Sequence, residues 1–101
     1  MVRGTTPTHY FGIPISKERV KNIRLTYRQD NRNILDMGME RVEIVGNKAK
    51  VTLSQQETFA FTAGIKAKVK LRVLSTDGVL FGNRKPISID VYESFNREVL
   101  T

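Results

Sequence analysis

The sequence predicts an all-β domain built from two stacked sheets, and three observations support this prediction. The first is the segment 65–73, in which apolar residues occupy every odd position and lysine or arginine every even position. Side chains on a strand point alternately to the two faces of a sheet, so this segment predicts a half-buried antiparallel strand. The second is the same period of two in several shorter segments, and the third is the Gly, Asn and Asp turn signals between them.

Turn residues divide the chain into about seven strands. Two prolines in the first segment suit an edge strand rather than a central one. The pairs Gly46-Asn47 and Asp77-Gly78 predict tight hairpin turns, because these residues readily adopt the positive φ angles that such turns require. Residues 29–33 read Gln-Asp-Asn-Arg-Asn and predict a further turn. The expected strands cover residues 5–14, 23–28, 34–37, 42–44, 49–53, 65–73 and 79–91.

Three places depart from the strand pattern. Ser54 and Glu57 match a capping box, which predicts one short helix or helical turn crossing between the sheets, with Gly64 able to end it. Residues 16–20 are long enough only for a helical turn or a loop. Residues 82–86 contain Gly, Asn and Pro, so a bulge or loop is expected to interrupt the last strand.

Short strands separated by turns roughly every 8 to 12 residues match an immunoglobulin-like β-sandwich, with a closed barrel as the alternative. In either architecture the odd residues of the alternating segment form part of the core. These residues are Ile65, Ala67, Val69, Leu71 and Val73. Beyond the last strand, residues 94–101 have a mixed composition, and they are expected to form either a flexible tail or a segment that docks on a neighbour.

Length and composition predict one small domain covering residues 1–101. The hydrophobic content of 40% is enough for one core, and 101 residues are too few for two independent cores. The chain has no cysteine, which excludes disulfides, thiolate catalysis and Cys-ligated metals and fits a reducing cytoplasm. No segment has the uninterrupted apolar core of a signal peptide or a membrane span, so we expect a soluble protein.

No arrangement of residues predicts catalysis, and we expect a non-enzymatic protein without cofactor or metal. His9 is the single histidine, so no histidine pair can bind a metal, and we expect it to be an ordinary strand residue. The aspartates lack the short alternating spacing of a calcium loop, and no glycine-rich loop precedes a Lys-Ser or Lys-Thr pair. Sequence spacing leaves open only a pair of carboxylates assembled from distant strands.

The chain is strongly basic, with 17 Lys and Arg against 10 Asp and Glu and a formal net charge of +7. Such a charge favours acidic proteins, nucleic acids or membranes as partners, and it also keeps a protein in solution. The most specific feature is the ladder of four cations on the alternating strand, with two arginines of an earlier strand expected nearby. We call these residues the basic face: Lys66, Lys68, Lys70, Arg72, Arg24 and Arg28.

The basic face has three interpretations. It is a solvated outer surface that deters edge-to-edge aggregation, a docking surface for an acidic partner, or a phosphate-binding surface for nucleic acid. Proteins that hold single-stranded nucleic acid usually interleave aromatic side chains with the cations, and the ladder contains none. Nucleic-acid binding is therefore the less favoured partner class, and membrane binding is not expected.

Several segments also carry a family resemblance. The runs at residues 48–58, 63–73, 75–78 and 87–91, together with the opening Arg3-Gly-Thr-Thr-Pro-Thr, resemble small immunoglobulin-like proteins encoded in tailed phages and prophages of Gram-positive bacteria. A related order of strand, short helical crossing, long strand and hairpin return occurs in the N-terminal domain of phage upper baseplate proteins. The resemblance covers nearly the whole chain but rests on β-pattern and turns, so it carries over no functional residues.

The resemblance implies a virion-associated structural or assembly protein of the tail or baseplate, located in the virion or in the bacterial host cytoplasm. Its partners would be other phage structural proteins, and association into a homo-oligomer is left open. The ladder of cations departs from the family pattern, so the resemblance does not identify its partner. The alternative function is that of a small basic nucleic-acid-binding β-domain.

Overall fold

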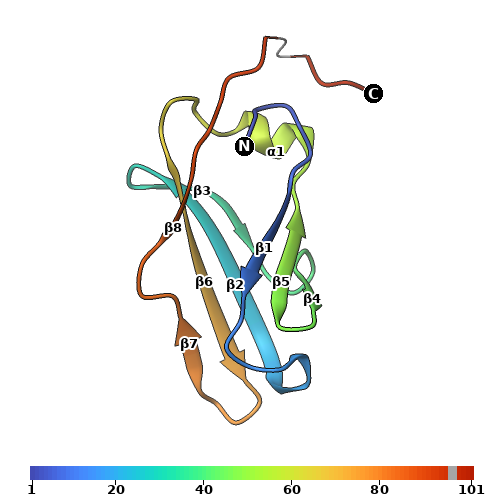
Figure 1. Ribbon diagram of the computed structural model, residues 1–101, viewed down its shortest axis with the longest axis vertical. Helices are drawn as coiled ribbons and strands as arrows, with labels where there is room; N and C mark the ends of the chain where they lie inside the picture. Colours follow the sequence, from blue (N-terminus) through green and yellow to red (C-terminus); the bar gives the residue numbers. More distant parts are fainter. Residues whose placement is uncertain (96–97) are drawn as a thin grey trace.

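The computed structural model describes residues 1–95 and 98–101, and in this part of the chain eight strands form two antiparallel sheets (Figure 1). The first sheet has the order β1-β5-β4, with strands Thr8–Gly12, Lys48–Thr52 and Glu43–Val45. The second has the order β3-β2-β6, and β7 and β8 both pair with β6. The strands of the second sheet are β3 (Arg32–Met37), β2 (Val20–Gln29), β6 (Ala67–Ser75), β7 (Leu80–Gly82) and β8 (Ile87–Ile89).

This strand order confirms the predicted immunoglobulin-like sandwich. In that fold, strands A-B-E-D form one sheet, and strands C, F and G form the other, extended by C′ in variable-type domains. If β1 is matched to strand B, the first sheet reads B-E-D and the second reads C′-C-F-G, with β7 and β8 sharing the place of strand G. The alternative prediction, a closed barrel, is wrong because the strands form two separate sheets.

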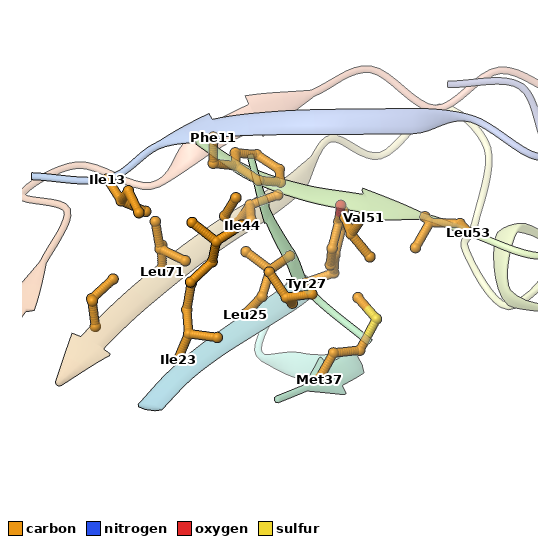
Figure 2. Packing of buried hydrophobic residues seen from close by; sticks show 14 of the residues in the cluster. Phe11, Ile13, Ile23, Leu25, Tyr27, Met37, Ile44, Val51, Leu53 and Leu71 are labelled. Atoms are coloured by element: carbon orange, nitrogen blue, oxygen red, sulfur yellow. The ribbon is translucent and has the colours of Figure 1, made fainter. Parts of the chain in front are cut away.

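The core lies between the sheets and is filled by one face of each (Figure 2). Tyr27 of β2 has no exposed surface and lies at its centre. The Tyr27 ring packs edge-on against Phe11 and Phe61, with centroid distances of 6.3 and 5.8 Å. Aromatic rings in such edge-to-face contacts stabilise a core by about 0.5–1.5 kcal/mol per pair beyond the buried area itself.

Strand β6 confirms the predicted alternation except at its start. Ile65 and Lys66 precede the strand, and Ile65 is half-buried rather than fully buried. The chain turns at Gly64, whose φ is +83°, and the Ile65 carbonyl accepts a hydrogen bond from the Gln29 side chain at 2.8 Å. This turn delays the pairing of the chain with β2. The other predicted core residues are buried: Ala67, Val69, Leu71 and Val73.

The predicted turns join the expected strands. The turn between β2 and β3 consists of Asp30 and Asn31, and Asp30 adopts a positive φ of 48°. Gly46 and Gly78 also have positive φ angles in the hairpins predicted for them. As predicted, β1 is an edge strand, and residues 17–19 form a single 3₁₀ turn, η1, from Lys17 to Arg19.

The helix α1, Gln55–Phe59, connects β5 of the first sheet to β6 of the second, as predicted. Both hydrogen bonds of the capping box are present: the Glu57 N–H donates to Ser54 Oγ, and the Ser54 N–H donates to Glu57 Oε1. The helix ends at Phe59 with Ala60 as its C-cap, not at Gly64. Gly64 instead forms the later turn that leads into β6.

The predicted interruption of the last strand separates β7 from β8, and the Asn83 side chain fills the gap. The Leu71 N–H donates to Asn83 Oδ1 at 2.8 Å, and Asn83 Nδ2 donates to the Val69 carbonyl at 3.2 Å. A side-chain amide presents the same donor and acceptor as a backbone peptide. Asn83 therefore satisfies the backbone groups of β6 that a continuous strand would have bonded.

Both chain ends lie near α1 (Figure 1). Val2 forms a parallel bridge with Tyr92, and the Leu100 backbone exchanges two hydrogen bonds of 2.7 Å with the Gln55 side chain. The expected tail, residues 94–101, thus contacts the body at Leu100, whereas Phe95 is fully exposed. Residues 96 and 97 of this tail lie outside the described residues.

Candidate interaction face

The structure brings the six predicted residues of the basic face together on the outer surface of the second sheet. Strands β2 and β6 are antiparallel neighbours, and their register places Arg24 opposite Arg72 and Arg28 opposite Lys68. Lys70 lies between these pairs, opposite Thr26. The exposed set on β6 is a direct consequence of its alternation, whereas the proximity of the β2 arginines follows from strand pairing.

Like charges face one another across this surface, and few have counter-ions. Directly opposed like charges in an antiparallel pair are destabilising. Two members of the face form exposed ion pairs: Arg24 with Asp36 at 3.2 Å and Lys66 with Asp90 at 3.3 Å. Within residues 1–95 and 98–101, no ion pair is formed by the other four members, which are Arg28, Lys68, Lys70 and Arg72.

One end of the basic face is hollowed into a depression of about 320 Å³. Four cations and a single carboxylate, that of Asp30 in the β2–β3 turn, surround it. Its lining residues are Arg28, Asp30, Asn31, Ile65, Lys66, Lys68, Lys70 and Pro86. Such an excess of cations around a concave surface favours an anionic group, such as a carboxylate or a phosphate.

The other end of the face is partly apolar, a feature that the sequence analysis missed. Leu74 continues the even positions of the ladder, and Leu80 lies directly opposite it on β7 and is 54% exposed. Together with Arg24 and Arg72 they line a second depression of about 360 Å³. The signal was present in the sequence, because the Asp77-Gly78 turn fixes which residue of the returning strand lies opposite Leu74.

His9 of β1 and Tyr27 of β2 form a partly buried polar contact between the two sheets. His9 Nδ1 lies 2.7 Å from the Tyr27 hydroxyl. Burial and the charge of the N-terminus lower the pKa of His9, and burial, with a smaller effect from Glu57, raises that of Tyr27. Both side chains are therefore held in their neutral forms. Among the described residues, neither side chain has a hydrogen bond to a nucleophile or carboxylate that would complete a catalytic set.

The remaining ionisable groups form no metal site in the described part of the chain, where no three His, Asp or Glu side chains gather closely enough to bind an ion. The helices described there are all too short or too polar to cross a membrane. A scan against protein-family models and searches of curated proteins and of solved structures find no match to this chain.

Proposed function

We propose that the protein is a non-enzymatic structural or assembly protein of a phage or prophage particle, and that its basic face docks on an acidic surface of a neighbouring protein. The observation that supports this proposal is the set of four cations on β2 and β6 that lack ion pairs among the described residues. The tail or baseplate location rests on the resemblance of the sequence to phage immunoglobulin-like proteins.

Folding alone gives no reason for this charge arrangement. A like-charged pair directly opposed in a sheet costs roughly 0.2–1 kcal/mol, and the face contains two such pairs, Arg24 with Arg72 and Arg28 with Lys68. An acidic partner would offset this repulsion. It would place a carboxylate in the cationic depression and a nonpolar side chain against Leu80.

Weak contacts of this kind suit a particle with many copies of each component. An exposed salt bridge contributes about 0–1 kcal/mol, so a single basic face would bind an acidic partner only weakly. Symmetric repetition multiplies such contacts into stable attachment, and the rigid sandwich keeps the cations in a fixed register. Electrostatic matching would also select the correct neighbour and accelerate encounter.

The test reverses the charge of three cations that lack ion pairs, in the variant Lys68→Glu, Lys70→Glu and Arg72→Glu. The matched control is Lys17→Glu, Lys21→Glu and Lys48→Glu, three exposed residues outside the face. Each substitution removes two charge units, so both variants change the formal net charge from +7 by −6, to +1. Urea unfolding monitored by circular dichroism establishes that both variants keep the fold.

The readout is binding to fluorescent poly-glutamate and to a labelled single-stranded DNA, each measured by anisotropy over a range of salt concentrations. We expect the control to bind poly-glutamate like the wild type and the face variant to lose binding at least tenfold. Equal losses in both variants would show that only net charge matters and would overturn the proposal. Tighter binding of DNA than of poly-glutamate, falling steeply with salt, would favour the nucleic-acid alternative instead.

A further inference from the structure

The first sheet is one strand narrower than the second. Three strands in the order β1-β5-β4 face a sheet in which β7 and β8 add a fourth strand position beside β6. In the immunoglobulin arrangement a strand A lies next to strand B, which corresponds to β1. Here Val2 of the N-terminal segment pairs with Tyr92, which follows β8, and not with β1. No strand of the described chain lies beside the outer edge of β1.

The outer edge of β1 presents backbone groups that pair with none of the described residues. The Ile13 N–H donates to the Asn47 carbonyl, and the Pro7 carbonyl accepts from the Leu53 N–H, so the odd residues of this segment bond to β5. In an antiparallel pair the alternate residues direct their N–H and C=O groups away from the partner. The outward residues are Thr8, Tyr10 and Gly12. A Cβ atom added at Gly12 would meet nothing within 4 Å, so the outer face of the sheet is also open at this residue.

An apolar groove lies beside this edge, between the end of β1 and strands β6 and β7. Its volume is about 360 Å³, and it is lined by Gly12, Ile13, Pro14, Leu71, Val73, Phe81, Gly82 and Asn83. Farther along the same border, Ile87 of β8 pairs with the buried Val69 and shares its inner face, yet Ile87 is 40% exposed. The narrower first sheet does not cover these inner side chains. We call the β1 edge, the groove and Ile87 the seam.

We propose that the seam binds one extended segment of a partner protein, which pairs with β1 as a fourth strand of the first sheet. This site is separate from the basic face and does not depend on it. The backbone of the segment would bond to the outward groups of Thr8, Tyr10 and Gly12, and every second side chain would cover Phe81 or Ile87. Recognition therefore requires apolar residues at alternate positions, as in other cases of strand addition to an open edge.

The charge and width of the molecule indicate which segment would fit. The net charge of +7 favours acidic residues at the positions that point outward. Two copies of the chain pairing edge to edge through β1 would bring together two molecules of this charge. The second sheet has one strand position more than the first, so we expect the β1 edge to accommodate one added strand, about 4.8 Å wide, more readily than a second whole molecule. The occupant is therefore an acidic, alternating segment of a different protein.

The probe is a capped nine-residue peptide in which valine and glutamate alternate, and the control peptide has the same composition with its valines in one block. Both are added to the full-length ¹⁵N-labelled protein at about physiological salt, near 0.15 M. We expect the alternating peptide to shift the amide signals of Thr8, Tyr10 and Gly12 saturably and to slow their hydrogen exchange at least tenfold. The block peptide should do neither.

Two variants test the location. Ile87→Glu places a carboxylate in the seam and should weaken peptide binding at least tenfold. Val45→Glu makes the same kind of change on β4, the opposite edge of the first sheet, at a residue that is 48% exposed, and should have little effect. Shifts confined to β2 and β6, equal binding of both peptides, or no saturation at millimolar concentration would each overturn the proposal. So would equal binding by folded Ile87→Glu and the wild type.

Discussion

The helical end of the molecule and the basic face are both rich in polar side chains, but they use them differently. At the helical end, formed by residues 1–5, α1 and the turn at residues 62–65, most polar side chains bond to one another or to the backbone, and among the described residues Arg3 Nε is the one buried side-chain nitrogen or oxygen without a partner. Thr58 is fully buried there, its hydroxyl accepts from the Gly4 N–H, and its single hydroxyl hydrogen is shared between the backbone carbonyls of Thr5 and Gln55. At the basic face, by contrast, cations oppose cations.

This difference separates residues that the fold requires from residues that it merely tolerates. A buried polar group without its partner costs roughly 1–3 kcal/mol, so internal hydrogen bonds at the helical end make its side chains necessary for stability. Exposed cations that repel one another do not stabilise the fold. The contrast predicts large losses of stability at the first region and none at the second, and four substitutions test it.

The largest effect is expected for Gln29→Leu. Gln29 is only 3% exposed, and its amide bonds to the carbonyls of Thr62 and Ile65 and to the Thr62 N–H at 2.7–2.8 Å. Leucine has a similar volume but leaves these three backbone groups without a partner, so the free energy of unfolding should fall by about 3 kcal/mol or more. Urea unfolding measures it, with the exposed Gln56→Leu as a control that should change it by less than about 0.5 kcal/mol.

A loss of less than about 1 kcal/mol for Gln29→Leu would mean that water or a rearranged turn replaces the amide. In that case the helical end would not be held by its internal polar contacts, and the contrast with the basic face would fail.

Gly4→Ala should have the next largest effect. The backbone at Gly4 has a φ of +79°, and a Cβ atom there would lie 2.5 Å from Phe59 Cζ. The substitution combines an unfavourable left-handed conformation with a steric overlap, so we expect a loss of about 1–3 kcal/mol. Gly12→Ala is the matched control, because a Cβ atom there meets nothing within 4 Å. Similar thermal unfolding of the two variants would contradict the close packing of the N-terminus on α1.

Glu57→Gln should have a smaller and pH-dependent effect. Arg41 holds the Glu57 carboxylate with two hydrogen bonds of 2.7 and 2.8 Å, and this contact, with the Ser54 N–H, lowers the pKa of Glu57 to about 2. A folded-state pKa below the unfolded value stabilises the protein above the unfolded pKa, and this contribution is lost as the pH falls through the folded pKa.

The difference in unfolding free energy between wild type and Glu57→Gln should therefore be constant near neutral pH and shrink as the pH falls from about 4.5 towards 2. Urea titrations at several pH values measure it, and the exposed Glu18→Gln serves as the control. A difference that stays constant down to the lowest pH would show that the carboxylate charge does not contribute.

The two regions also differ in how far the sequence could predict them, because the basic face depends on neighbouring residues. The alternation in β6, the capping box at Ser54 and the Asp77-Gly78 turn are encoded within a few neighbouring residues, and each appears in the structure. Periodicity also predicted which residues of β6 face solvent. The basic face as a surface was thus largely predictable, although its apolar end at Leu80 was not recognised.

The contacts at the helical end and the seam could not be predicted in the same way. Gln29 bonds to a turn more than thirty residues away, and the Asn83 amide replaces a backbone segment, so neither role leaves a local pattern. The same long-range contact explains why Ile65 was wrongly expected to start the strand. The open edge of β1 depends on how many strands each sheet contains, which is a property of the whole topology.

The smallest effect, and one of opposite sign, is expected for Arg72→Thr at the basic face. Removing the cation opposite Arg24 relieves a like-charge contact and places a strand-favouring residue there, much as Thr26 already lies opposite Lys70. The free energy of unfolding should rise by about 0.2–1 kcal/mol at low salt, and the gain should shrink as salt screens the repulsion.

Lys48→Thr is the control for this prediction, because Lys48 lies opposite Gly12 and Val45 and has no like charge across from it. If Arg72→Thr gains stability while its binding to poly-glutamate weakens, the arginine lowers the stability of the fold and contributes to binding. A loss of stability would instead mean that the stem of Arg72 packs against its neighbours in the depression it shares with Leu74. Arg72 would then belong with the structural side chains of the helical end, and the division between the two regions would not hold.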